Sequence, residues 1–73
     1  MNNFKLARLN LGLTQAELAE ILNVSTVTVC KWELGRALPK VKRLKEVANV
    51  LHTTVPALLE DPHERRQSDG AAS

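Results

Sequence analysis

Helix stop and start signals follow one another closely in the first half of this chain, so the helices there must be short. Gly12 ends a first helical segment, and Thr14 begins the next with Glu17 spaced as its capping-box partner. Residues 23–25 (NVS) then break the chain, because asparagine tolerates the left-handed conformation and serine caps helices. Gly35 ends the segment that follows. The pattern predicts two short helices joined by a three-residue turn.

The rest of the chain also reads as helix and short turn, which predicts an all-α fold of five helices. Asn2 or Asn3 can cap the first helix, a fourth runs to about Leu51, and Thr54 can cap a short fifth. The third segment, roughly residues 26–34, is rich in β-branched residues, so a strand is the competing local prediction. We favour a helix because caps and stops frame it and no other stretch offers a strand partner. The expected domain spans residues 1–61.

The expected core is aliphatic, because 44% of the residues are hydrophobic but only one Phe and one Trp are present. The side chains expected to face inward are Phe4, Ala7, Leu11, Leu18, Ile21, Leu22, Val29, Trp32, Leu44, Val47, Ala48, Leu51, Val55, Leu58 and Leu59. Ala19 and Val24 are expected beside Val29, between the second and third helices. Trp32 could instead be a platform for stacking bases, but it shares a face with Val29 and is assigned to the core.

Residues 62–73 are polar and small, and we expect them to form a flexible tail because they offer too little apolar surface to bury. We expect a cytoplasmic protein, since the chain shows no apolar run long enough for a membrane span and no signal-peptide pattern. The single Cys30 has no partner for an internal disulfide.

We expect no enzymatic activity and no cofactor. The sequence shows no Ser/His/acid set, paired carboxylates or phosphate-binding loop. His52 and His63 lie eleven residues apart without paired cysteines, which matches no zinc-binding spacing, so no metal site is expected. Cys30 is a weak candidate for a redox sensor, because one thiol has no visible partner.

Basic residues concentrate between Ser25 and Lys45, where Glu33 is the only acidic residue. They are Lys31, Arg36, Lys40, Lys42, Arg43 and Lys45. A local basic field suits a polyanion, although a solvated helix face would look the same from charge alone. Two short helices joined by a tight turn are, however, the geometry that places the second helix in a DNA major groove. Together these features predict binding to double-stranded DNA.

Three segments resemble the Cro/CI-type helix-turn-helix family of transcriptional regulators: residues 11–19 (LGLTQAELA), 24–25 (VS) and 28–35 (TVCKWELG). The resemblance extends over about residues 4–59 and implies a compact five-helix, lambda-repressor-like fold. It also implies sequence-specific DNA binding that regulates transcription, most simply by repression. The family's large phage repressors carry a C-terminal self-cleavage domain, for which the short tail leaves no room. We therefore expect a stand-alone regulator of a phage, plasmid, toxin–antitoxin or restriction operon.

The resemblance implies roles for individual positions. The positions that face base edges hold Thr26, Val27 and Lys31, and Arg8 and Glu33 match a pair that forms an internal salt bridge. The residues expected to contact DNA phosphates are Gln15, Ser25, Thr28, Arg36, Lys40 and Arg43. Gln15 stands at a helix N-terminus, which favours an anion. Two alternatives stay open: Gln15 as a simple helix-start residue, and the basic residues as a solvated face.

This chain departs from the family pattern at the base-reading positions, which often carry Gln, Asn, Ser or Arg. Val27 can only touch thymine methyl groups or fill space, and Cys30 stands where a small polar residue is common. We predict readout by methyl contact and by Lys31, with part of the specificity coming from DNA shape. The alternative function is a protein-interaction module, an antitoxin or anti-repressor, with weak or lost DNA binding. Its tail would then bind a protein partner.

We also expect a homodimer on a pseudo-palindromic operator, because a single recognition helix buries too little surface for tight binding. The expected dimer contacts are Val55, Leu58 and Leu59 of the fifth helix. The alternative is that these residues only close the core of the monomer.

Overall fold

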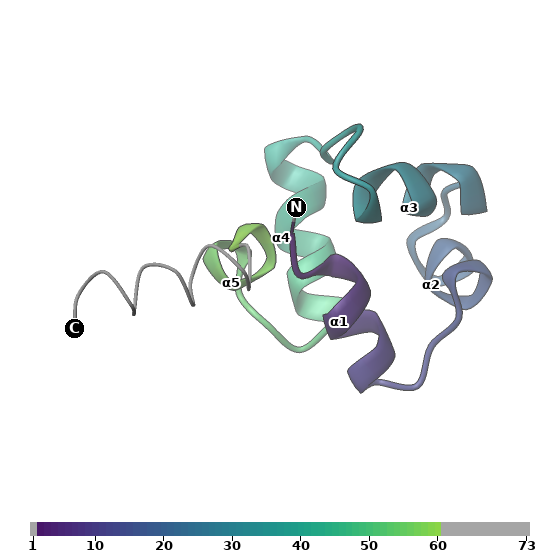
Figure 1. Ribbon diagram of the computed structural model, residues 1–73, viewed down its shortest axis with the longest axis horizontal. Helices are drawn as coiled ribbons and strands as arrows, with labels where there is room; N and C mark the ends of the chain where they lie inside the picture. The colour runs from purple at the N-terminus through teal and green to yellow at the C-terminus, as the bar shows by residue number, and fades with distance from the viewer. Residues whose placement is uncertain (1, 61–73) are drawn as a thin grey trace.

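The computed structural model describes residues 2–60, which form five α-helices and no strand (Figure 1). The helices are α1 (Phe4–Asn10), α2 (Gln15–Leu22), α3 (Thr26–Glu33), α4 (Val41–Val50) and α5 (Val55–Leu59). The all-α prediction is confirmed, and the strand alternative at the start of α3 is excluded. The predicted tail, 62–73, lies outside the described residues, as does His63. None of the helices in residues 2–60 is long and apolar enough to cross a membrane.

The caps around α2 and α3 form as expected. The Thr14 hydroxyl accepts a hydrogen bond from the Glu17 amide at 3.0 Å, and the Glu17 carboxylate accepts one from the Thr14 amide at 2.8 Å. Asn23 adopts the left-handed conformation, with φ of 58°, where α2 ends. Ser25 Oγ then accepts from the Thr28 amide at 3.1 Å. These local bonds explain why the chain leaves α2 and begins α3 within three residues.

Asn2 and Asn3 tie the start of α1 to two other helices. Asn2 Oδ1 accepts from the Phe4 amide at 3.1 Å, and Asn2 Nδ2 donates to the carbonyl of Trp32 in α3 at 2.8 Å. Asn3 donates through Nδ2 to the Ala57 carbonyl of α5 at 2.9 Å. The side chain that caps the Phe4 amide is thus that of Asn2, two residues before the first residue of α1, and not that of Asn3.

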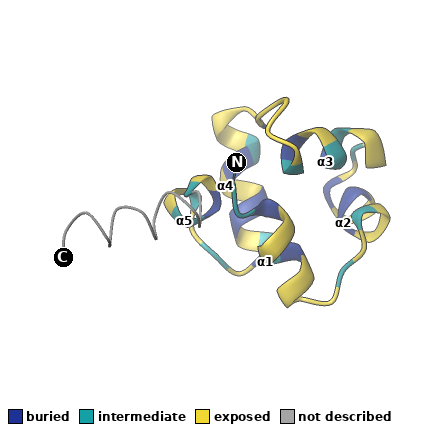
Figure 2. Ribbon diagram, in the orientation of Figure 1, coloured by how far each residue is buried: buried dark blue, intermediate teal, exposed yellow. Residues whose placement is uncertain are grey.

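The helices are arranged so that α2 and α3 lie at one end and α5 at the other, with α1 and α4 between them (Figure 1). One buried cluster runs through all five helices (Figure 2). Its members are Phe4, Leu18, Ala19, Leu22, Val29, Trp32, Leu44, Val47, Ala48, Leu51 and Leu58. Ala7, Val24 and Val55 are partly buried against it. The inward faces predicted for α3 and α4 are therefore confirmed.

Three residues predicted to face inward are exposed instead. Leu11 lies just beyond the end of α1 and is 40% exposed. Ile21 is 55% exposed because Leu18, Ala19 and Leu22 already form the buried face of α2. Leu59, the last residue of α5, is 41% exposed. All three lie at the edge or end of a short helix, where helical spacing does not by itself decide which side chains are covered.

Candidate nucleic-acid interface

Helix α3 presents one face to the core and the other to solvent. Val29 and Trp32 are buried, and the Trp32 ring lies 6.1 Å from the ring of Phe4, centroid to centroid. Val27 is 61% exposed, and Thr26 and Lys31 are exposed as well. The residues predicted to read bases thus share the solvent side of a helix that is held from behind. Cys30 is half-buried beside them.

The two hydroxyl groups at the start of α3 pair with each other. Ser25 Oγ lies 2.8 Å from Thr28 Oγ1, and Ser25 is exposed while Thr28 is half-buried. Two hydroxyls contribute two hydrogens, and this bond uses one of them. One donor is left for an external acceptor such as a phosphate oxygen.

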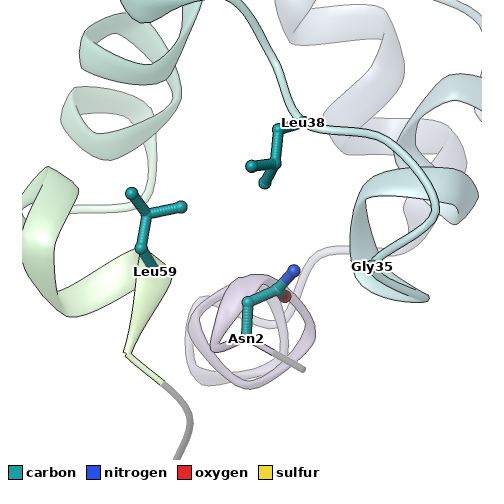
Figure 3. Close-up of a pocket in the computed structure, with 4 residues that line it drawn as sticks. All are labelled: Asn2, Gly35, Leu38 and Leu59. Atoms are coloured by element: carbon teal, nitrogen blue, oxygen red, sulfur yellow. The ribbon is translucent and has the colours of Figure 1, made fainter.

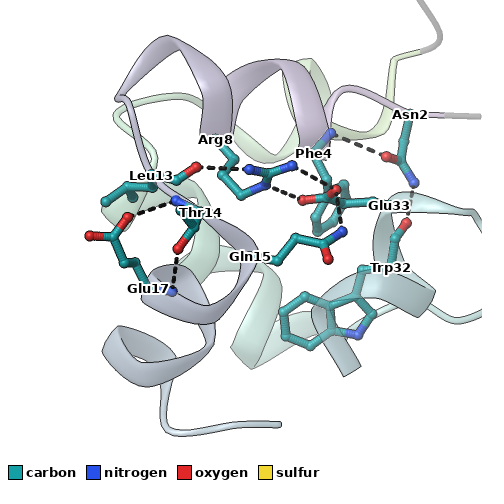
Figure 4. A network of polar contacts seen from close by, with 9 residues as sticks. All are labelled: Asn2, Phe4, Arg8, Leu13, Thr14, Gln15, Glu17, Trp32 and Glu33. Carbon is teal, nitrogen blue, oxygen red and sulfur yellow. Dashed lines mark hydrogen bonds and ion pairs between the residues drawn. The ribbon is translucent and has the colours of Figure 1, made fainter. Parts of the chain in front are cut away.

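A buried ion pair joins α1 to the last residue of α3 (Figure 4). Arg8 Nε lies 2.6 Å from Glu33 Oε2, and Arg8 Nη2 donates to Glu33 Oε1 at 3.2 Å. The two side chains are only 8% and 4% exposed. Arg8 Nη1 donates to the Leu13 carbonyl at 2.8 Å, which also secures the segment before α2. The pair expected between Arg8 and Glu33 is present.

Gln15 joins the same network, which its sequence position did not reveal. Its Nε2 donates to Glu33 Oε1 at 3.0 Å, so the carboxylate receives donors from both α1 and α2 (Figure 4). One hydrogen of the amide is used in this way, and the second is left for another acceptor. Gln15 is half-buried at the first position of α2. The side chain is therefore oriented before any ligand arrives.

The basic residues after α3 differ in their surroundings. Arg36 and Lys40 are exposed. Arg43 is not a free surface cation, because its Nη1 donates to the Leu22 carbonyl at 2.9 Å and to Glu46 Oε1 at 3.2 Å. Arg43 is thus engaged with the end of α2 and with Glu46, a contact between helices that spacing within α4 alone does not reveal. A hollow of about 290 Å³ lies here, lined by Lys40, Lys42, Arg43 and Glu46.

The apolar residues of α5 do not form one exposed surface. Leu58 is fully buried, so the expectation that it contacts a second chain is wrong: its side chain closes the core. Val55 is half-buried, so of the three residues expected at a dimer contact only Leu59 is well exposed. Leu59 faces a hollow of about 290 Å³ that it lines with Asn2, Gly35 and Leu38 (Figure 3). Leu38 is 60% exposed and was not anticipated in this role.

Comparison with known proteins decides the family. A family model described as helix-turn-helix matches residues 4–58, from the first residue of α1 to the buried Leu58 of α5. The chain belongs to the Cro/CI-type helix-turn-helix family. The family model thus spans every element that supports α3.

A similar protein is the HTH-type transcriptional activator BcrR of Enterococcus faecalis. The two sequences are 41% identical over 59 residues, which cover 78% of this chain but only 29% of the relative. The chain therefore spans less than a third of that relative's length. No solved structure matches the chain.

Proposed function

We propose that α3 reads an operator through the major groove of double-stranded DNA, with Thr26, Val27 and Lys31 against the base edges. The observation that carries this proposal is the two-sided character of α3, whose inner face is buried and whose outer face is open. Lys31 can donate to guanine O6 and N7, and Val27 can contact a thymine methyl group. Sequence-dependent DNA shape would supply the remaining specificity.

Phosphate contacts on either side of the groove would orient the domain. Gln15 has a free amide hydrogen at the N-terminus of α2, where the helix dipole favours an anion. The Ser25–Thr28 pair has one hydroxyl hydrogen to donate at the N-terminus of α3. Arg36 and Lys40 follow in the loop after α3, and their exposed charges suit phosphate oxygens. Such contacts position the protein but do not read sequence.

The proposed assembly is a homodimer on a pseudo-palindromic operator. Its half-sites would lie about 34 Å apart, one turn of DNA, or a multiple of that distance. Leu38 and Leu59, together with half-buried Val55, are the apolar groups that a second copy could cover. The regulation we propose is repression of a phage, plasmid, toxin–antitoxin or similar bacterial operon, by occupying its promoter.

The test is a fluorescence-anisotropy titration of the protein against DNA from upstream of its own gene, with a scrambled duplex as control. We expect tighter binding to the native duplex and weaker binding at higher salt, because bound phosphates release counterions. Weak and equal binding to both duplexes would contradict the proposal and favour a protein-interaction module, an antitoxin or anti-repressor. A promoter–reporter fusion then distinguishes repression, in which the protein lowers expression, from activation.

A further inference from the structure

Arg43 links α4 to the turn that precedes α3. Its Nη1 donates to the Leu22 carbonyl at 2.9 Å and lies 3.2 Å from both carboxylate oxygens of Glu46. Leu22 is the last residue of α2, so the guanidinium stands where the helix dipole has its negative pole. Within residues 2–60, no other side-chain hydrogen bond joins α4 to α2 or α3.

The end of α2 needs this donor. The last turn of α2 contains no basic residue of its own. The amides of Asn23 and Val24 turn back to the carbonyls of Glu20 and Ala19, at 3.2 and 2.9 Å. In the described part of the chain, no backbone amide reaches the Leu22 carbonyl, and Arg43 supplies the hydrogen bond instead. A hydrogen bond from a charged donor is stronger than one between neutral groups.

The position of this bond connects it to α3. The turn that it holds begins at Asn23, directly after Leu22, and α3 begins at Thr26. A small movement of that turn would displace Thr26 and Val27, two of the three residues proposed to face the base edges. Hydrogen bonds to base edges depend on close geometry, whereas attraction to phosphates is long-range and independent of sequence. Loosening the turn should therefore weaken specific binding more than non-specific binding.

We infer that Arg43 is a positioning residue for DNA recognition, which holds the α2–α3 turn and thereby α3, and that it does not itself contact phosphate. The inference rests on the proposed function, because it takes α3 to be the base-reading helix. Glu46, 55% exposed, orients the guanidinium from one turn further along α4. The neutral variant E46Q should therefore have a smaller effect in the same direction as R43Q.

The experiment uses the 73-residue chain and a duplex that the wild-type protein selects from a random library, with a scrambled duplex for comparison. K42Q is the matched control, because exposed Lys42 is the neighbouring residue on α4, lines the same hollow and loses the same charge. Relative to K42Q, R43Q should bind the selected duplex about tenfold more weakly, the loss expected for one charged hydrogen bond. Binding of R43Q to the scrambled duplex should match that of K42Q. The salt dependence of R43Q should match that of the wild type.

A different pattern would overturn the inference. If Arg43 contacted phosphate, R43Q would weaken both duplexes by the same factor and lower the slope of log K against log salt by about 0.9. An R43Q variant that binds like K42Q in every respect would overturn it too. If the wild type selects no sequence from the library, the proposed function fails and this inference falls with it. If the wild type is selective and R43Q is equally selective, the proposed function stands and only the role inferred for Arg43 is refuted.

A measurement without DNA covers the case in which R43Q does not fold. Amide NMR shifts of residues 23–26 should change in E46Q, and in R43Q where it is folded, but not in K42Q. Unchanged shifts in E46Q, together with unchanged selectivity, would overturn the inference even if R43Q unfolds. Trp32, which is buried, reports through its fluorescence whether each variant has kept its core.

Discussion

Arg8 and Glu33 meet through two hydrogen bonds, the shorter of 2.6 Å, in a setting where neither side chain is more than 8% exposed. The pair crosses from α1 to the end of α3, and it also receives Gln15 from the start of α2. The Glu33 carboxylate thus connects three helices, α1, α2 and α3. Glu33 follows directly after the buried Trp32, so the same end of α3 is held both by the core and by this ion pair.

Removing one member of this pair should destabilise the domain strongly. We expect Arg8→Met to lower the free energy of unfolding by about 3–5 kcal/mol, because Glu33 would be left as a buried charge without its partner. A domain of this kind has only about 5–15 kcal/mol in total, so a large unfolded fraction should appear. Urea denaturation followed by Trp32 fluorescence measures the change. Lys5→Met, on the exposed side of α1, is the control and should cost little.

The double variant Arg8→Met with Glu33→Leu tests the cause. Replacing both charges with apolar groups removes the unpaired charge, so the double variant should be more stable than Arg8→Met alone. A double variant that is less stable than either single one would argue against this account, and would assign the loss to packing instead.

The capping box at α2 should make stability depend on pH. The hydrogen bond from the Thr14 backbone amide, and then the bond with its side chain, lower the pKa of Glu17 below the ordinary glutamate value. A carboxylate with a lowered pKa in the folded state stabilises the fold above its unfolded-state pKa, and this contribution is lost as the pH falls through the folded-state pKa.

Thermal unfolding of wild type and Glu17→Gln between about pH 6 and about pH 3 tests this expectation, since glutamate titrates in that range. The wild type should be the more stable at the upper end, and the difference should shrink toward the lower end. A difference that stays constant across the range would show that the charge on Glu17 has no part in the cap.

Local signals in the sequence were enough to predict where α2 and α3 begin. Thr14, Glu17 and Ser25 act on amides three residues away, so their partners can be identified from spacing alone. The end of α4 was predicted only approximately, at about Leu51. The chain reverses after Leu51 through His52 in the left-handed conformation, with φ of 57°, a position where glycine is the usual signal.

Contacts between helices were harder to predict, because they depend on which surfaces the fold brings together. Gln15 and Glu33 are 18 residues apart, and Arg43 and Leu22 are 21 apart. Helical spacing describes the surface of one helix but not the helices packed against it, so it does not reveal that Arg43 reaches the end of α2. The Arg8–Glu33 pair was expected only through the family resemblance.

Lys31 should carry part of the base specificity. Its side chain is exposed in the last turn of α3, so Lys31→Ala should weaken binding to the selected duplex and reduce discrimination at one base pair. A good contact of this kind contributes about 1–3 kcal/mol of discrimination. Anisotropy titrations against duplexes changed one pair at a time measure the effect. Lys45→Ala, an exposed basic residue of α4, is the control, and an unchanged ratio of selected to random binding in Lys31→Ala would exclude readout by Lys31.

The leucines of α5 should separate dimerisation from folding. Leu59 lines an open hollow with Leu38, whereas the adjacent Leu58 is fully buried in the core. Substitutions at Leu58 and Leu59 should therefore have different effects. Leu59→Asp should reduce the mass measured by light scattering from that of a dimer toward that of a monomer, and should leave the helical circular dichroism unchanged. Leu58→Ala should instead lower the free energy of unfolding by about 2–5 kcal/mol, because it opens a cavity in the core.

Leu6→Asp is the matched control for Leu59→Asp, since Leu6 is a comparably exposed leucine, 53% against 41%, on a different helix. It should leave the mass unchanged if the dimer forms through Leu38 and Leu59. A wild type that scatters as a monomer at every concentration would contradict the dimer outright. A dimer that Leu6→Asp disrupts and Leu59→Asp does not would place the contact on α1. In that case the distance between the α3 helices of the two copies would differ from that in a dimer formed through α5, because α1 lies between α5 and the α2–α3 pair (Figure 1).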